Sequence, residues 1–196
     1  EERIATGRQE GVTTDYVVAT FATKGKYEEL ASKLHAQCVQ LGIQADVTVE
    51  SPPDGTKNVR DWACKQKPRV IRAALEKHRR PVLFIDADDE LLAMPTFPIC
   101  DVGFIRNPEK KVIATHLEVA SFGYYEPTPA AFAWLDDWQA EIDRGTPDHR
   151  AYQCTYTRFV GTSRHPGTFA DVTAYVRGAI RQNPSPHGYR DKPTLT

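Results

Sequence analysis

The feature that most constrains the fold is a short apolar run followed directly by acidic residues. Residues 81–85 read Pro-Val-Leu-Phe-Ile, and residues 86–90 read Asp-Ala-Asp-Asp-Glu. A wholly apolar run of this length is typical of a strand that is covered on both faces, as in a parallel sheet. In open α/β sheets, ligands bind beyond the carboxyl ends of the strands. The sequence therefore predicts an α/β fold with an acidic ligand site just after residue 85.

Asp86 and Asp88 are expected to bind a divalent metal ion. Alternation along an extended backbone points both carboxylates to the same side, while the small Ala87 packs inward. Mg²⁺ and Mn²⁺ prefer oxygen ligands and often bind to few protein carboxylates together with substrate phosphates. Such an ion would neutralise a diphosphate leaving group. An acidic turn that merely ends the strand is the alternative interpretation.

Strands and helices are expected to alternate along the chain, which favours one α/β sandwich. The β-branched and aromatic residues of 15–21 predict a buried strand. Residues 27–41 have helical apolar spacing and stop at Gly42, and residues 44–50 alternate as a strand does. A second helix is predicted over 67–78. The remaining predictions are strands at 101–105 and 111–120, a helix from an N-cap at Thr128 to about Gly145, and a short helix around Ala151.

The 196 residues fit one domain, expected over 14–196 after a flexible lead-in at 1–13. The four cysteines lie far apart and form no Cys-x-x-Cys motif, so we expect reduced thiols rather than a zinc site or a disulfide framework. No apolar run approaches the roughly 20 residues that span a bilayer. A cytoplasmic location is therefore expected.

Positive charge is concentrated in two stretches, although the net charge is −1. Residues 65–80 contain seven basic residues and one acid, and residues 144–192 contain eight basic residues and three acids. Such stretches suit ligands that carry phosphates, including nucleic acid. A solvated surface of mixed charge is the alternative.

Two blocks of short motifs resemble the GT-A-fold nucleotide-diphospho-sugar transferases, a group of glycosyltransferases. The first block contains Trp62, Lys67-Pro68 and the strand end 81–88. The second contains residues 121–125 (Ser-Phe-Gly-Tyr-Tyr), Pro127-Thr128 and the apolar Phe132, Leu135 and Trp138. The resemblance covers about residues 14 to 157. It departs from the pattern at Phe122, which separates Ser121 from Gly123, and at His149, which follows Asp148 where glutamine is usual.

The resemblance implies a single-domain, Rossmann-like GT-A fold with a mixed, mostly parallel sheet flanked by helices. Residues 14–100 would form the nucleotide-donor half, and residues 101–196 the acceptor half and tail. Asp86 and Asp88 would bind Mn²⁺ or Mg²⁺, with Asp88 as the more direct ligand and a catalytic residue. The other implied donor contacts are Thr20, Thr23 and Tyr27 around the nucleoside, Lys67, Arg69 and Lys192 at the phosphates, and Gly123 beside the sugar or acceptor.

Three further residues receive roles from the resemblance. His187 belongs to a segment that is similar to the closing His…Lys-Pro motif of retaining, glycogenin-like transferases, which implies a third metal ligand. His165 is the competing candidate for that role. Asp148 would contact the sugar or acceptor, and it is the only candidate base if the reaction inverts the anomeric centre; as an alternative, it caps the following helix. The stereochemical outcome stays open.

The implied reaction moves a sugar from a nucleotide-diphosphate sugar, with UDP as the first expectation, to an acceptor hydroxyl. The basic stretches make a hydroxymethylated DNA base one candidate acceptor. A glycan, a lipid-linked sugar or a protein side chain are the others. A non-catalytic nucleotide-sugar binding module is an alternative function. A phosphotransferase or nucleotidyltransferase is less favoured, because residues 23–26 are too poor in glycine for a phosphate-binding loop.

Overall fold

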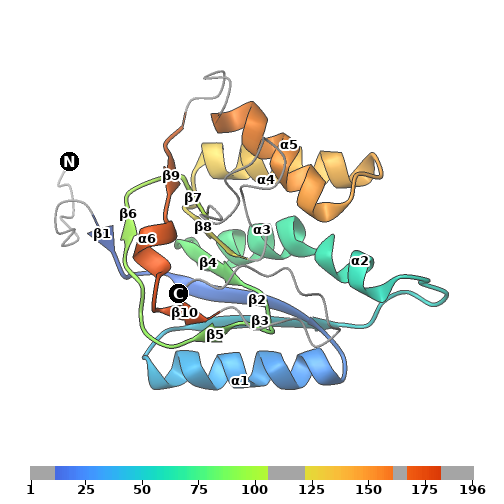
Figure 1. The fold of residues 1–196 in the computed structure, drawn as a ribbon, viewed down its shortest axis with the longest axis horizontal. Helices are drawn as coiled ribbons and strands as arrows, with labels where there is room; N and C mark the ends of the chain where they lie inside the picture. Colours follow the sequence, from blue (N-terminus) through green and yellow to red (C-terminus); the bar gives the residue numbers. More distant parts are fainter. Residues whose placement is uncertain (1–11, 106–121, 161–166, 182–196) are drawn as a thin grey trace.

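A computed structural model describes residues 12–105, 122–160 and 167–181. Its centre is a six-stranded sheet in the order β3-β2-β4-β8-β7-β9 (Figure 1). The strands are β2 (Val17–Thr23), β3 (Ala45–Glu50), β4 (Val82–Ile85), β7 (Val102–Phe104), β8 (Phe122–Tyr125) and β9 (Phe169–Asp171). β8 runs antiparallel to both of its neighbours, and the other pairs are parallel. The predicted mixed, mostly parallel α/β sheet is confirmed.

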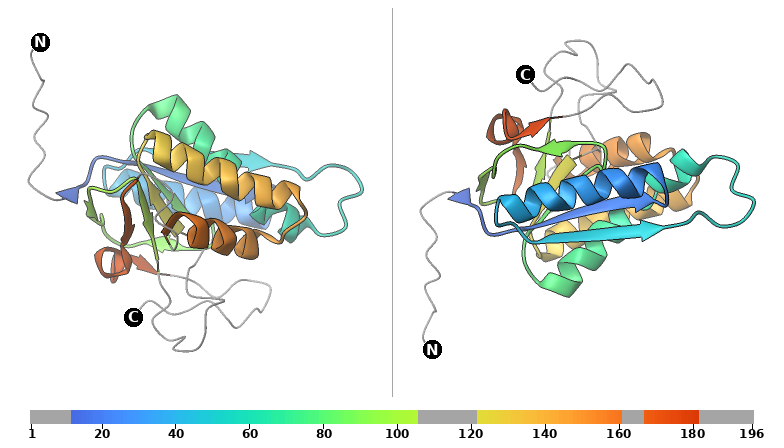
Figure 2. Two further views of the ribbon diagram at one scale, coloured as in Figure 1. Left: turned by 90° about the horizontal axis from the view of Figure 1, so that it is seen from above. Right: turned by 90° about the horizontal axis from the view of Figure 1, so that it is seen from below.

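Helices cover both faces of this sheet. α1 (Lys26–Gln40) lies on one face, and α3 (Lys67–His78), α4 (Pro129–Asp143) and α5 (Asp148–Val160) lie on the other (Figure 1). Figure 2 shows α4 and α5 side by side over the sheet. The alternation of β2 builds both cores: Val18 packs with Leu34 of α1, whereas Phe21 packs toward Ile71 of α3. Burying apolar side chains on both faces is the main favourable contribution to folding here.

Several local predictions are confirmed. The helix predicted over 67–78 occupies those residues. α1 is followed by Gly42, whose φ of 69° is the left-handed conformation that ends helices. Thr128 caps α4, since its hydroxyl oxygen accepts a hydrogen bond from the Ala131 amide at 3.3 Å. The strand predicted at 111–120 lies outside the described residues.

Other elements differ from the prediction. β2 extends to Thr23, which pairs with Glu50 of β3, so the turn before α1 begins one residue later than expected. α2 (Val59–Cys64) was not predicted: it is short, buries no residue and begins at the Asn58 cap. α5 spans 13 residues rather than a short helix. No strand was predicted at β8, because sequence alternation does not mark a strand that is buried along its whole length.

Short elements complete the described chain. Val12 and Thr13, at the end of the expected lead-in, form strand β1, which pairs with β6 (Phe97–Pro98). This pairing with β6 therefore places two residues before position 14 in a strand. β5 (Glu90–Leu91) pairs with β10 (Ile180–Arg181), and α6 (Thr173–Val176) precedes β10. None of the helices in the described ranges is both long and apolar enough to traverse a bilayer.

Candidate functional site

A pocket of about 380 Å³ opens at the carboxyl ends of β2 and β4. The helices α1 and α3 leave this region on opposite faces of the sheet, which is the place where open α/β sheets bind ligands. Its walls come from the end of β2 and the start of α1, from one side of α2, from the start of α3 and from the residues after β4. Five residues singled out in the sequence line it, namely Thr23, Tyr27, Lys67, Asp86 and Asp88.

The turn after β4 directs the acidic residues. The four residues of β4 are fully buried, and the Asp89 amide then donates a hydrogen bond to the Asp86 carbonyl at 3.0 Å. Ala87 packs with Ala22 of β2 and Ala31 of α1. Three small side chains let the helix approach the strand ends closely, as the sequence suggested for Ala87. Asp86 and Asp88, on either side of Ala87, both border the pocket.

Lys67 connects the pocket to the interior through two ion pairs. Its Nζ lies 3.0 Å from Oδ1 and 3.4 Å from Oδ2 of Asp86. The same nitrogen lies 3.8 Å from Oδ2 of Asp148. Lys67 is 7% exposed and Asp148 is 6% exposed, so both charges are removed from water. The helix starts of α3 and α5 thus meet in a buried group of one cation and two carboxylates.

The electrostatics of this group follow from burial and charge together. Burial lowers the pKa of Lys67, but the charges of Asp86 and Asp148 outweigh it and raise the pKa above its ordinary value. Burial also raises the pKa of Asp148 to about 7, although the positive charge of Lys67 opposes that rise. For Asp148 the loss of hydration therefore exceeds the attraction of the ammonium group. Lys67 stays protonated at every physiological pH.

Asp148 turns inward from the first residue of α5, and it does not line the pocket. The indole of Trp138 lies close enough to lower its pKa. Even so, neither Oδ1 of Asp148 nor Nε1 of Trp138 makes a well-formed hydrogen bond with any described residue. The sequence left helix capping as an alternative role for Asp148. However, Asp148 is the first residue of α5 rather than the residue before it, and its side chain contacts Lys67.

Thr20 and Gly123 lie outside the pocket walls. Thr20 is buried in β2, and its hydroxyl oxygen has no hydrogen-bond partner among the described residues. Gly123 is paired with Phe84 across the β4–β8 ladder. A Cβ on Gly123 would lie 2.6 Å from the hydroxyl oxygen of Tyr125. The space beside this glycine is therefore filled by a side chain of the same strand.

Arg69 also points away from the pocket. Its guanidinium forms an ion pair with Glu50 at 2.7 Å, and its Nε donates to Gln66 at 3.1 Å. It lines a second hollow, between α3 and α4, that includes Trp62 and Leu135. Of the other candidates, His165, His187 and Lys192 lie outside the described residues.

A divalent cation fits the carboxylates that are present. Asp86 and Asp88 reach one pocket from a single turn, and oxygen ligands of this kind suit Mg²⁺ or Mn²⁺ when substrate phosphates complete the shell. Within the ranges that the structure describes, no group of three histidine, cysteine or acidic side chains stands ready to hold a metal. Asp86 already has Lys67 as a counter-ion.

The basic stretch 65–80 is largely neutralised in the folded chain. Six of its seven basic residues form ion pairs, and most of the partners come from outside the stretch. Arg72 pairs with Asp136 of α4, for example, and Lys77 pairs with Asp46 of β3. In the second stretch, Arg158 joins α5 to Asp137 of α4. These pairs support the mixed-charge surface that the sequence left as the alternative.

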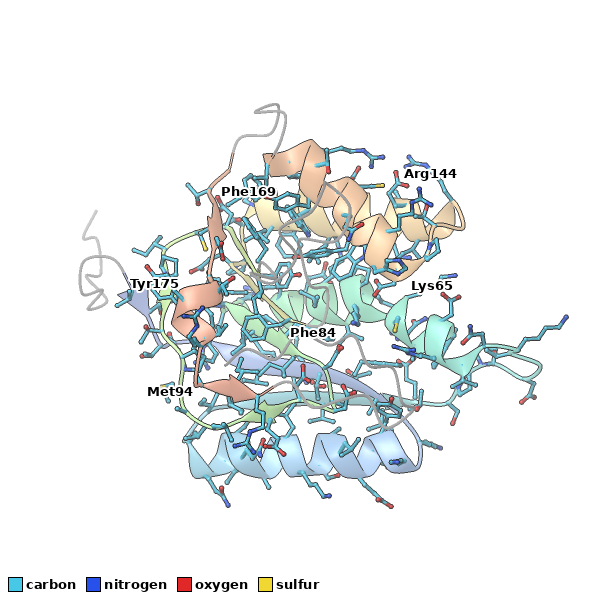
Figure 3. The ribbon with its side chains drawn as sticks, viewed as in Figure 1. Lys65, Phe84, Met94, Arg144, Phe169 and Tyr175 are labelled. Carbon is cyan, nitrogen blue, oxygen red and sulfur yellow. The ribbon has the colours of Figure 1, made fainter. Side chains whose placement is uncertain are left out.

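The structure also adds residues that sequence reasoning missed. Lys24, Lys26 and Arg60 line the pocket, so that, with Lys67, four cations face two carboxylates. Cys64 lines it as well, and burial raises the pKa of this thiol. In Figure 3, Lys65, which follows Cys64 in the chain, lies beside α2. Phe84 lies near the middle of the sheet. The strand-to-helix turn could have drawn attention to Lys24 and Lys26, but α2 has no apolar periodicity that would have placed Arg60.

Comparisons with known proteins support the fold. Neither a protein-family model nor a curated protein matches the chain. A solved structure does: a glycosyltransferase involved in the glycosylation of the major capsid of PBCV-1. The TM-score is 0.56 at 12% sequence identity, over 81% of this chain and 83% of the other. This chain therefore has the mixed α/β fold of a glycosyltransferase, over most of the length of both molecules.

Proposed function

We propose that the protein is a metal-dependent glycosyltransferase that uses a nucleotide-diphosphate sugar, with UDP as the expected nucleotide. The observation that carries the proposal is the pocket at the ends of β2 and β4, where Asp86 and Asp88 lie beside four cationic side chains. The fold shared with a known glycosyltransferase supports it. The position of the pocket also agrees with the general rule for ligands of open α/β sheets.

The pocket is chemically suited to such a donor. Its apolar walls, with Phe21, Tyr27 and Val59, can accept a base and a ribose. Lys24, Lys26 and Arg60 can accept phosphate oxygens through charge-assisted hydrogen bonds. Asp86 and Asp88 would hold Mn²⁺ or Mg²⁺, which when bound supplies positive charge to the departing diphosphate. His187 and Lys192 would complete this end of the site if the closing motif acts as it does in the proteins it resembles.

For the acceptor, we propose a hydroxyl of a glycan or of a protein side chain. The structural neighbour is involved in the glycosylation of the major capsid of PBCV-1, which favours a glycan or protein acceptor. The ion pairs along residues 65–80 leave little charge excess there for a DNA backbone. Asp148, the candidate base for inversion, is buried behind Lys67 and does not line the pocket, so it is not proposed as the acceptor base.

A thermal-shift panel tests the proposed donor. The purified protein is melted with UDP-, GDP- and dTDP-sugars, each with and without Mn²⁺. A ligand that binds only the folded state raises the melting midpoint. At ligand concentrations above the Kd, each tenfold increase in concentration adds about 1.4 kcal/mol of stabilisation. We expect stabilisation by one donor that depends on Mn²⁺. No response to any donor would contradict the proposal.

Release of nucleoside diphosphate separates an enzyme from a binding module. Incubation of the stabilising donor with Mn²⁺ and without acceptor is expected to release nucleoside diphosphate slowly, because water can replace the acceptor. Binding without release, and without transfer to any glycan or protein acceptor, would favour the non-catalytic binding module.

A further inference from the structure

Lys67 is placed so that it can be held by either of two carboxylates. Its Nζ contacts Asp86 on the pocket side at 3.0 Å and faces Asp148 on the interior side at 3.8 Å. The two acids belong to different elements, the turn after β4 and the first turn of α5. The shorter contact is with Asp86, so this potential metal ligand shares its charge with a lysine.

A shared carboxylate creates a conflict. Asp86 cannot give its full charge both to a divalent cation and to the ammonium group, and two cations on one carboxylate repel each other strongly in a buried place. Drawing Asp86 to a metal ion would leave the buried charge of Lys67 less well compensated, which is destabilising. A second carboxylate beside Lys67 would limit that cost when Asp86 becomes a metal ligand.

Asp148 has the properties of that second acceptor. It is as buried as Lys67, it lies on the side away from the pocket, and its Oδ1 has no well-formed hydrogen bond with the described residues. Its Oδ2, the oxygen that faces Lys67, can therefore accept the ammonium group. The 3.8 Å separation from Nζ can shorten through a small rotation of the lysine side chain.

We propose that Asp148 is a positioning residue that receives the ammonium group of Lys67 when Asp86 binds a divalent cation. The proposal rests on the metal site of the proposed function. It assigns Asp148 an indirect effect: the residue acts on Asp86 through Lys67, and it does not contact donor, acceptor or metal. When the ammonium group of Lys67 moves toward Asp148, the carboxylate of Asp86 becomes available to the metal ion. The positive charge of Lys67 still stays close to the proposed site of the donor phosphates.

The test is the affinity for Mn²⁺ alone, measured by electron paramagnetic resonance titration of free Mn²⁺ at pH 8. Asp148→Asn keeps the shape of the side chain but removes its charge, so that of the two carboxylates beside Lys67 only Asp86 still carries a negative charge. We expect Mn²⁺ affinity to fall on the order of tenfold, as for directly coupled residues. Lys67→Met removes the competitor and is expected to bind Mn²⁺ several-fold more tightly than the unaltered protein.

The double variant decides whether the effect passes through Lys67. In the Lys67→Met background, Asp148→Asn is expected to change Mn²⁺ affinity by less than about twofold, because no ammonium group remains to be held. Asp143→Asn, an exposed acid on α4, is the matched control and is expected to leave the affinity unchanged. Circular dichroism melting checks that each variant is folded.

Three results would overturn the inference: equal affinity of Asp148→Asn and the unaltered protein, an equal loss with and without Lys67, or no gain in Lys67→Met. The third result is measured on Lys67→Met alone, so it tests the inference even if Asp148→Asn does not fold. Mn²⁺ binding by the unaltered protein is measured first. If it is absent, the inference fails together with the metal dependence of the proposed function. If the protein binds Mn²⁺ and shows Mn²⁺-dependent stabilisation by the donor, but the effects of Asp148→Asn and Lys67→Met on Mn²⁺ affinity are independent, only the role of Asp148 is wrong.

Discussion

The ring of Tyr125 fills the place where Gly123, two residues earlier on the same face of β8, has no side chain. A Cβ on Gly123 would lie 2.6 Å from the Tyr125 hydroxyl oxygen and 2.7 Å from Cε2. Tyr125 is 1% exposed, so its ring cannot move out into solvent. Gly123 is therefore required by the packing of β8, which pairs with β4, the strand that ends just before Asp86.

Gly123→Ala is expected to destabilise the protein by roughly 1–3 kcal/mol, the usual cost of inserting a methyl group into a filled core. Urea denaturation followed by circular dichroism measures the change in the free energy of unfolding. Donor affinity, measured below the transition, should change less than stability does. An unaltered unfolding midpoint would show that the Tyr125 ring has free space to enter.

Asp88→Asn is expected to abolish the Mn²⁺-dependent part of donor stabilisation while leaving the fold intact. The amide is nearly isosteric but carries no charge for a hard cation. Thermal shifts with the stabilising donor, with and without Mn²⁺, provide the measurement. Asp54→Asn, an exposed acid outside the pocket, is the control. A Mn²⁺ response that survives in Asp88→Asn would contradict this role for Asp88.

Arg60 and Arg69 form a matched pair for the phosphate contacts. Arg60 lines the pocket, whereas Arg69 lines the second hollow and pairs with Glu50. Arg60→Ala should weaken the binding of UDP by roughly 1 kcal/mol, about fivefold, which is the scale of an exposed charge interaction. Arg69→Ala should have almost no effect. Isothermal titration calorimetry measures both, and a larger loss for Arg69 would restore the role that the sequence resemblance gave it.

The burial of Asp148 is expected to make the stability of the protein depend on pH. Burial raises its pKa to about 7 in the folded protein, whereas an unfolded chain has an aspartate pKa near ~3.9. The folded state thus binds more protons between these values, and the contribution of Asp148 to stability falls as the pH rises from about 4 to about 7.

Asp148→Asn removes this slope. The variant should therefore gain stability relative to the unaltered protein as the pH rises from 5 to 8. The difference between their free energies of unfolding should change on the order of 1 kcal/mol per unit of pKa shift. Urea denaturation at the two pH values measures it. The exposed Asp143→Asn should show no such trend, and a parallel pH dependence in all three proteins would show that Asp148 is already ionised at pH 5.

Duplex DNA is expected to bind weakly. Six of the seven basic residues in 65–80 are paired with acids, so few of them can replace counter-ions on a phosphate backbone. An electrophoretic shift assay across a salt series should show no complex at physiological salt. A complex whose affinity falls steeply with salt would instead support the DNA base as acceptor.

The sequence by itself determined the elements whose signals are local. The apolar run 82–85 and the acids after it specify a buried strand with a polar end, because such a strand must be covered on both faces. Helix α3, the Gly42 stop and the Thr128 cap follow from apolar periodicity and from backbone groups that need partners. Of the five predicted residues that line the pocket, Asp86 and Asp88 follow from this strand end, whereas Thr23, Tyr27 and Lys67 were implied by the family resemblance.

Only the tertiary structure decided which charged residues act together. Lys67 and Asp148 are 81 positions apart along the chain, and no local pattern indicates that α3 and α5 begin beside each other. The same holds for Arg69, whose partner Glu50 turns it from the pocket, and for Arg60, which the short helix α2 brings to it. Burial and long-range ion pairing set the charge of this site, and both are properties of the packed chain rather than of any segment.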